Sequence, residues 1–370
     1  VNTAVTDADK LVIKKSIELF NGTIDKGEAE IKDAVAPVIM RAQLVDHINP
    51  KGEDRLTITF SEKVKKITTE NSFIFYSEKE KKEYKPKIRL IDHSDETAVF
   101  SVVSLSDDID RIGLSDLINI NKDGEVIDLV NNKQDNPDNI RREIEVHRIL
   151  ELKEVIYFDN NANGRIDSIF VGIFGEYAFT NNDLAIFKNK VKLPDHRQFT
   201  IEKVNGLNSG FSFNVSQDTS VNINTAVTFE DILVFENDIN LDNNGTLLKS
   251  SESIIDAVAP VIMRAKLVDY MKPGKEDQLT ITFSEKIDSI TSENPFLFYS
   301  VDNDKVYKAT LSTLGHSGET AVFAVTSLSD GMNRVSSRDS INIYKDGKVF
   351  DLADNQQDNP GNIRRDIEIE

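Results

Sequence analysis

The ten residues 33–42, Asp-Ala-Val-Ala-Pro-Val-Ile-Met-Arg-Ala, occur a second time without change at residues 256–265. From there residues 33–146 align with residues 256–369 at a constant offset of 223 without a gap, and 69 of the 114 paired positions are identical. Identity of this extent within one chain is typical of a protein that repeats a whole domain. We therefore expect the aligned stretches to be two copies of one domain.

A shorter match extends the repeat upstream. Asn-Thr-Ala-Val-Thr at residues 2–6 recurs at residues 224–228, so the full period is near 222 residues. A period of this length is too long for one small domain and indicates two kinds of domain, which we term the first type and the second type. We predict a partial second-type domain, comprising its last strands only, at residues 1–32, first-type domains at residues 33–147 and 256–370, and a second-type domain at residues 148–255.

Short segments in which β-branched and aromatic residues alternate with polar ones dominate the chain. A period of two is typical of strands with one buried face, and turn clusters such as Lys122-Asp123-Gly124 separate them. About seven short strands in ~110 residues indicate a β-sandwich. We expect no helix beyond short turns around Ser106 to Asp110. The strands predicted for the first copy are residues 56–60, 73–76, 97–102, 117–120 and 144–146.

Composition narrows the classes of partner. The 370 residues include 39% hydrophobic and 29% charged ones, which is typical of folded soluble domains. A net charge of −19 disfavours binding to nucleic acid or anionic lipid and favours cations. Cysteine is absent, so the chain has no disulfide or thiolate metal site. No apolar run approaches the ~20 residues of a membrane span. Because the chain opens on Val-Asn-Thr without a signal segment, we expect a mature protein or an excerpt.

A possible cation site lies in residues 159–167, Asp-Asn-Asn-Ala-Asn-Gly-Arg-Ile-Asp. These residues match the first nine positions of the EF-hand loop, in which alternate oxygen ligands surround calcium and a glycine allows the sharp turn. Position twelve is Phe170 instead of glutamate, and the flanking residues 155–158 and 169–173 look like strands, so the loop is not an EF-hand. A metal-free Asn/Gly turn is the alternative. The expected calcium ligands are Asp159, Asn161, Asn163, the carbonyl of Arg165, and Asp167.

Further acidic segments lie in the first-type domains. Residues 46–54 and 269–277 also have Asp at both ends, but lysine and proline replace the central ligands, so calcium is less expected there. Residues 128–138 are rich in Asp and Asn, and the pattern recurs at residues 351–360. They fit either a calcium site near the end of the domain or a pair of Asx turns before the last strand.

Several of these motifs resemble a known family. Asp-Ala-Val-Ala-Pro-Val-Ile at residues 33–39, Leu-Thr-Ile-Thr-Phe-Ser-Glu-Lys-Val at 56–64 and Ile-Asp-Leu-Val-Asn-Asn at 127–132 resemble the bacterial Ig-like domains of S-layer and other surface proteins. Asn131 and Asp354 stand where that family has glycine. Residues 157–168 are similar to a related extracellular repeat with a calcium loop. The resemblance implies an all-β fold of tandem immunoglobulin-like β-sandwich domains in an extended array, located outside the cell at its surface.

Signatures of catalysis are missing from the sequence. It contains no Gly-x-Ser-x-Gly, no His-Glu-x-x-His and no P-loop, and its carboxylates are evenly dispersed. We therefore expect a non-catalytic protein. A carbohydrate-binding module or adhesin is the main alternative, although sugar-binding platforms commonly use tryptophan, which is absent. An accessory region of a secreted hydrolase is a third possibility.

The leading functional hypothesis is a structural repeat region of a bacterial extracellular surface or fibre protein, rigidified by calcium. The expected partners are other copies of the chain or neighbouring repeats, with a surface or glycan ligand as a further option. Two strands alone cannot cover their apolar face or pair their edges, so residues 1–32 need partners. Either another subunit completes them by strand addition, or the chain is an excerpt cut through a domain.

Overall fold

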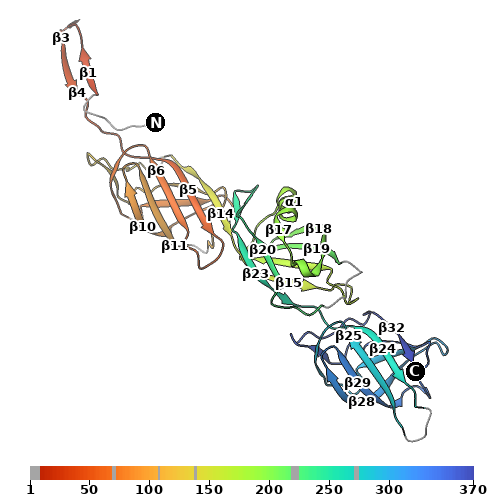
Figure 1. Ribbon diagram of the computed structural model, residues 1–370. Helices are drawn as coiled ribbons and strands as arrows, with labels where there is room; N and C mark the ends of the chain where they lie inside the picture. The colour runs from red at the N-terminus through yellow and green to blue at the C-terminus, as the bar shows by residue number, and fades with distance from the viewer. Residues whose placement is uncertain (1–8, 69–71, 107–108, 137–139, 218–224, 271–274) are drawn as a thin grey trace. The chain divides into compact units, whose positions relative to one another are not determined.

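The computed structural model describes residues 9–68, 72–106, 109–136, 140–217, 225–270 and 275–370 (Figure 1). About 53% of the chain is strand and 4% is helix, so the predicted all-β fold of immunoglobulin-like domains is confirmed. The chain forms two compact units, Val1–Leu150 with Asn244–Thr246, and Glu151–Asn243 with Leu247–Glu370. The finer division into four segments stays a prediction. Among the described residues no helix is long and apolar enough to cross a membrane.

The first copy of the first-type domain is built on one continuous path of strands. Their order is β10-β11-β6-β5-β14-β12-β8-β9, and β13 pairs separately with β7. Strand β14 runs parallel to β5 and antiparallel to β12, so it joins the two halves of the sandwich. Every strand predicted for this copy is present. The strands are β5 (Ile39–His47), β6 (Arg55–Phe60), β7 (Val64–Ile67), β8 (Phe73–Ser77), β9 (Lys82–Tyr84), β10 (Pro86–Ser94), β11 (Thr97–Leu105), β12 (Leu117–Ile120), β13 (Val126–Asp128) and β14 (Arg142–Leu150).

Alternation of apolar and polar residues produces the core of this domain. Along β6 the side chains of Leu56, Ile58 and Phe60 are buried, while the residues between them are partly exposed. The ring of Phe73 stacks at 6.5 Å on Phe60 and meets Phe100 edge-on at 5.3 Å. Burial of each large apolar side chain contributes about 1.5–3 kcal/mol, so these residues decide which face of each strand turns inward.

The second copy repeats the pairing but closes into a barrel, in the order β24-β25-β29-β28-β27-β30-β32. Strand β28 is continuous here, whereas the equivalent stretch of the first copy is split at Lys85 into β9 and β10. The first copy has Pro86 where the second has Ala309, and proline cannot donate a ladder hydrogen bond. The strands are β24 (Ile262–Val268), β25 (Asp277–Phe283), β26 (Ile287–Ile290), β27 (Phe296–Ser300), β28 (Lys305–Ser317), β29 (Thr320–Leu328), β30 (Ser340–Ile343), β31 (Val349–Asp351) and β32 (Arg365–Ile369).

The second-type domain has a sheet in the order β17-β20-β23-β15-β16-β19-β18, with β15 and β23 parallel at its centre. The predicted strands at residues 155–158 and 169–173 are confirmed as parts of β15 and β16. The elements are β15 (Leu152–Phe158), β16 (Ser168–Ile173), α1 (Asn181–Lys190), β17 (Val191–Lys192), η1 (Asp195–Arg197), β18 (Phe199–Leu207), β19 (Gly210–Gln217), β20 (Ile232–Phe235), β21 (Ile239–Leu241), β22 (Gly245–Leu247) and β23 (Ser250–Asp256).

Helix α1 corrects the expectation that the chain has no helix beyond short turns, and the described residues around Ser106 to Asp110 form none. Thr180 and Asp183 form a reciprocal capping box at its first turn. Phe187 is its large buried side chain and stacks on Phe211 at 4.3 Å. The helix is short and mostly polar, so its apolar periodicity is too weak to read from sequence.

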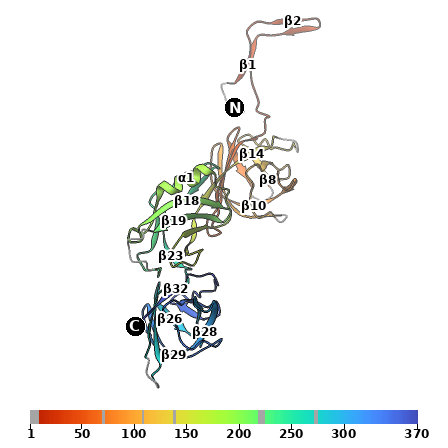
Figure 2. The same ribbon diagram turned by 90° about the vertical axis from the view of Figure 1, so that its right-hand side faces the viewer.

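The N-terminal segment contains four short strands, two of which, β1 and β2, are labelled in Figure 2. β1 pairs only with β4 and β2 only with β3 among the described strands. Residues 1–8 of the predicted partial domain lie outside the described residues. The strands are β1 (Lys10–Ile13), β2 (Ile17–Leu19), β3 (Gly22–Ile24) and β4 (Gly27–Glu30).

Candidate metal centres

Each first-type domain gathers three carboxylates, and the two sets occupy equivalent positions of the repeat. In each set every residue offers one oxygen that lies within 4.8 Å of the others. The glutamate and the second aspartate of each set are at most 2% exposed. We term these sets the carboxylate clusters. They consist of Asp33, Glu62 and Asp128 in the first copy and of Asp256, Glu285 and Asp351 in the second.

Strand ends position the cluster of the second copy. Asp256 is the last residue of β23, Glu285 follows β25, and Asp351 is the last residue of β31. β31 pairs with β26 so that Asp351 lies opposite Ile287, two residues after Glu285. These carboxylates are far apart in sequence, and the sheet pairing brings them together.

The acidic segments at residues 128–138 and 351–360 contain the Asx turns considered above. Asp351 Oδ1 accepts hydrogen bonds from the backbone N–H groups of Ala353 and Asn355, both at 2.8 Å. Asp128 accepts the equivalent bonds from Val130 at 2.9 Å and Asn132 at 2.7 Å. Asp128 and Asp351 therefore each form an Asx turn and also belong to a carboxylate cluster. Residues 137–139 lie outside the described residues.

Burial and the repulsion between neighbouring carboxylates make the second cluster costly to ionise without a counterion. Burial, followed by the charges of Asp256 and Asp351, raises the pKa of Glu285 to about 9. Burial and the charge of Asp351 also raise the pKa of Asp256 to about 6. Carboxylates this close together cannot all stay charged unless a cation compensates them. Because every ligand is a carboxylate oxygen, a hard cation such as calcium fits this donor set.

The loop at residues 159–167 folds around Asp159. The backbone N–H of Gly164 donates to Asp159 Oδ2 at 2.7 Å, and that of Asn163 donates to Oδ1 at 3.2 Å. Gly164 has a φ of +81°, and a Cβ there would lie 2.5 Å from Val261 Cγ2, so both conformation and space require glycine. Burial raises the pKa of Asp159, although these backbone hydrogen bonds oppose the shift.

Asn163 and Asp167 differ in their readiness to bind a cation. The side-chain oxygen of Asn163 is buried and has no hydrogen-bond partner in the described structure, which suits an oxygen ligand. Asp167 instead accepts hydrogen bonds from the side-chain amides of Asn160 at 2.6 Å and Asn161 at 3.3 Å. The described structure thus brings Asp159 and Asn163 together, while Asn161 points its amide nitrogen at Asp167. Calcium binding by Asp159, Asn161, Asn163, Arg165 and Asp167 stays a prediction.

The loop at residues 46–54 is organised differently. Asp46 is fully buried, and its carboxylate lies 3.6 Å from Arg111 Nε and 3.5 Å from Arg148 Nε. Burial raises the pKa of Asp46, and the two guanidinium groups oppose that shift. Two arginines already supply the countercharge at this position. In the loop at residues 269–277, residues 271–274 lie outside the described residues.

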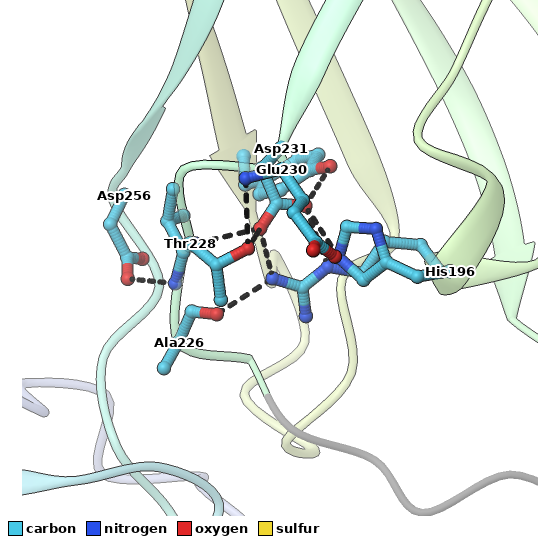
Figure 3. Close-up of polar contacts among 9 residues, drawn as sticks. His196, Ala226, Thr228, Glu230, Asp231 and Asp256 are labelled. Carbon is cyan, nitrogen blue, oxygen red and sulfur yellow. Dashed lines mark hydrogen bonds and ion pairs between the residues drawn. The ribbon is translucent and has the colours of Figure 1, made fainter.

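A buried ion pair at the edge of the second-type sheet was not identified from sequence. Arg197 donates to Asp231 through Nε at 2.7 Å and Nη2 at 2.5 Å, and the Tyr157 hydroxyl donates to the same carboxylate at 2.9 Å. Figure 3 shows Thr228 and His196 beside Asp231. Burial would raise the pKa of Asp231, but the hydrogen bonds from Arg197 and its neighbours lower it. This network is saturated with donors and holds β20 in place.

The chain has only distant similarity to known proteins. No protein-family model and no curated protein matches the chain. Among solved structures, it is 11% identical over 96% of its length to the N-terminal eight Ig domains of Down Syndrome Cell Adhesion Molecule, with a TM-score of 0.22. It is 10% identical over 91% to the S-layer protein rSbsC(31-844), with a TM-score of 0.23. The chain covers 39% and 54% of those chains. Similarity this low supports no conclusion about function.

Proposed function

We propose that this chain is a non-catalytic, structural repeat region of a bacterial extracellular surface or fibre protein, and that bound calcium rigidifies it. The observation that carries the proposal is the recurrence of the same, mostly buried carboxylate cluster in both first-type domains. The two copies differ at many other positions but share these three carboxylates. We take the cluster as part of the common function of the repeated domain. The extracellular setting rests on the resemblance of the motifs to surface-protein domains, and it supplies calcium at high concentration.

Calcium at the second cluster would stiffen the entry to its domain. Asp256 accepts the backbone N–H of Val227 at 3.2 Å and that of Val258 at 3.0 Å, so one carboxylate already links two passing chain segments. Its partners Glu285 and Asp351 belong to the body of the first-type domain. A cation shared by the three would fix those segments to the domain. Loss of bending freedom then follows from ordinary coordination geometry.

The loop at residues 159–167 would add a second calcium ion to the same unit. The backbone N–H of Ile363 donates to the carbonyl of Ala162 at 3.1 Å, and Gly164 lies against Val261 and Met263. The loop is therefore in contact with the first-type domain that follows it. Calcium bound by Asp159, Asn163 and their neighbours would hold this contact in one conformation.

The proposal also includes assembly. Residues 1–32 would join head to tail with another subunit by strand complementation, which extends the repeat beyond one chain. In the described part of this segment β1 and β4 pair with each other alone, so both strands have an edge open to a further strand.

Thermal unfolding with calcium and with chelator tests the calcium claim. A cation that binds only the folded state at 100 times its dissociation constant stabilises by about 2.7 kcal/mol, which corresponds to several degrees in Tm. We expect a rise of this size with calcium, and a much smaller one with magnesium. Superimposable curves in calcium and chelator would remove the calcium claim and leave the structural role standing.

A further inference from the structure

The N-terminal segment has the strand pairing of the last part of the second-type domain. In β1 and β4, Leu11 pairs with Ala29 and Ile13 with Gly27. In β20 and β23, the equivalent pairs are Leu233 with Glu252 and Phe235 with Ser250. The offset is 222 through β2 and 223 from β3 onward, and each of the four pairs in one ladder has its counterpart in the other.

Backbone hydrogen bonds outside the ladders agree as well. The N–H of Ile31 donates to the carbonyl of Asp9 at 3.2 Å, and the N–H of Ile254 donates to the carbonyl of Asp231 at 2.9 Å. The described residues 9–31 thus have the fold of residues 231–254. They form half of a second-type domain.

The two halves differ in what covers their apolar face. In the complete domain five apolar side chains of this half are at most 7% exposed, whereas their five N-terminal counterparts are at least 43% exposed. The buried set is Leu233, Ile239, Leu241, Leu247 and Ile254, and the exposed counterparts are Leu11, Ile17, Leu19, Ile24 and Ile31.

Within this chain the covering partner is known. Strand β15 pairs in parallel with β23, with Val155 opposite Ile254 and Ile156 opposite Ile255. Phe187 of α1 meets Phe235 at 6.0 Å. Both contacts come from residues 151–217, the first half of the second-type domain. The same elements would cover β1 and β4, the counterparts of β20 and β23.

Charge complementarity points to the same partner. Asp231 is 1% exposed because Arg197 and Tyr157 of the first half donate to its carboxylate. Its counterpart Asp9 is exposed. An arginine and a tyrosine delivered by a first half would bury Asp9 in the same way.

We propose that residues 9–31 are a docking surface for the first half of a second-type domain, a polypeptide with the chemistry of residues 151–217. That half contributes a parallel strand beside β4, an apolar cover over Leu11 and Ile31, and an arginine to Asp9. This inference rests on the assembly part of the proposed function and names the partner. It is independent of calcium.

The test joins a second copy of residues 148–222 directly to Val1 of the full chain. This order reproduces the natural one, because residue 222 is followed by Ile223, the counterpart of Val1. Amide hydrogen exchange is measured by mass spectrometry in residues 9–31, with residues 231–254 of the same molecule as internal reference. We expect exchange in residues 9–31 to slow by about 100-fold or more and to approach the reference.

Two variants of the extended chain make the result specific. Asp9→Ala and Leu11→Asp should each restore fast exchange in residues 9–31. Glu28→Ser is the matched control, because Glu28 and its counterpart Ser251 are both exposed, and it should keep the protection. Unchanged exchange after extension would overturn the inference. Protection that grows with protein concentration in the original chain but is absent from the extended one would also overturn it, because a surface other than a first half would then cover residues 9–31 and the assembly proposal would survive.

Discussion

The hydroxyl of Thr225 donates a hydrogen bond of 2.8 Å to Glu285 Oε1, and both residues are at most 1% exposed. Thr225 precedes the last strands of the second-type domain, and Glu285 belongs to the carboxylate cluster of the first-type domain. The bond satisfies one oxygen of a glutamate that has two carboxylates beside it. Glu285 therefore accepts a stabilising hydrogen bond and is also repelled by two neighbouring carboxylates. A mutation at Glu285 tests the energetics of the whole cluster.

Replacing Glu285 by Gln separates the two effects. The amide keeps the shape and is neutral without binding a proton, whereas buried Glu285 must take up a proton near neutral pH, so the chelated protein should gain about 1–2 kcal/mol in free energy of unfolding at pH 7. The same change removes a calcium ligand, so the calcium-dependent rise in Tm should shrink. Calorimetry with calcium and with chelator measures both. Glu276→Gln, at an exposed position, is the control and should change neither. A chelated variant less stable than the parent would contradict the repulsion argument.

The pKa of Glu285 also predicts how stability depends on pH in chelator. Its pKa is about 9 in the folded state against 4.5 for the free group, so between these values the folded state holds more protons than the unfolded state. Stability is then highest below pH 4.5 as far as this group is concerned, and it is lost as the pH rises toward 9, by at most about 1.4 kcal/mol per pH unit. Urea unfolding at pH 6, 7.5 and 9 (about 1.5 units apart) checks the slope.

Calcium and the Glu285→Gln variant should each flatten that dependence, because neither leaves a buried carboxylate to take up the proton. The Asp256 pKa of about 6 adds a weaker decline at lower pH, in the same direction. A slope that stays the same in the variant would assign the pH dependence to other groups.

Local sequence patterns predicted the strands but not the cluster. The alternation in residues 56–60 requires one face to be buried whatever the neighbours are, so β6 could be identified alone. Asp128 and Asp351 could be identified as candidate ligands because Asp and Asn residues follow them closely in sequence. Glu62 and Glu285, in contrast, sit in the strand motif Thr-Phe-Ser-Glu-Lys and look like surface charges until sheet pairing brings them beside the aspartates. The match between Asp9 and Asp231 was readable from the repeat, but their different environments were not.

Asn163 tests the loop at residues 159–167 without disturbing its backbone. In chelator Asn163→Ala should leave stability unchanged or slightly higher, because it removes a buried oxygen that has no hydrogen-bond partner. The number of calcium ions bound, counted by native mass spectrometry, should fall by one. Asn208→Ala is the matched control, since Asn208 is exposed and lies outside the loop and the predicted ligand set. An unchanged ion count in Asn163→Ala would favour the metal-free turn.

The buried ion pair of Arg197 and Asp231 should contribute strongly to the second-type domain. Arg197→Met leaves the Asp231 carboxylate buried with its main donor gone, and loss of one partner from a buried pair costs about 3–5 kcal/mol. Asp231→Asn alone should also destabilise, while the double variant should cost less than the sum of the two because no buried charge is left unpaired. Chemical denaturation measures the loss of stability, and amide hydrogen exchange at residues 231–254 localises it.

The exposed pair Arg41 and Glu145 is the control, and its removal should have a much smaller effect, because water already solvates both groups. If the double variant loses as much stability as the two single variants together, Arg197 and Asp231 act separately. The expectation that an arginine stabilises docking onto Asp9 would then have no energetic support.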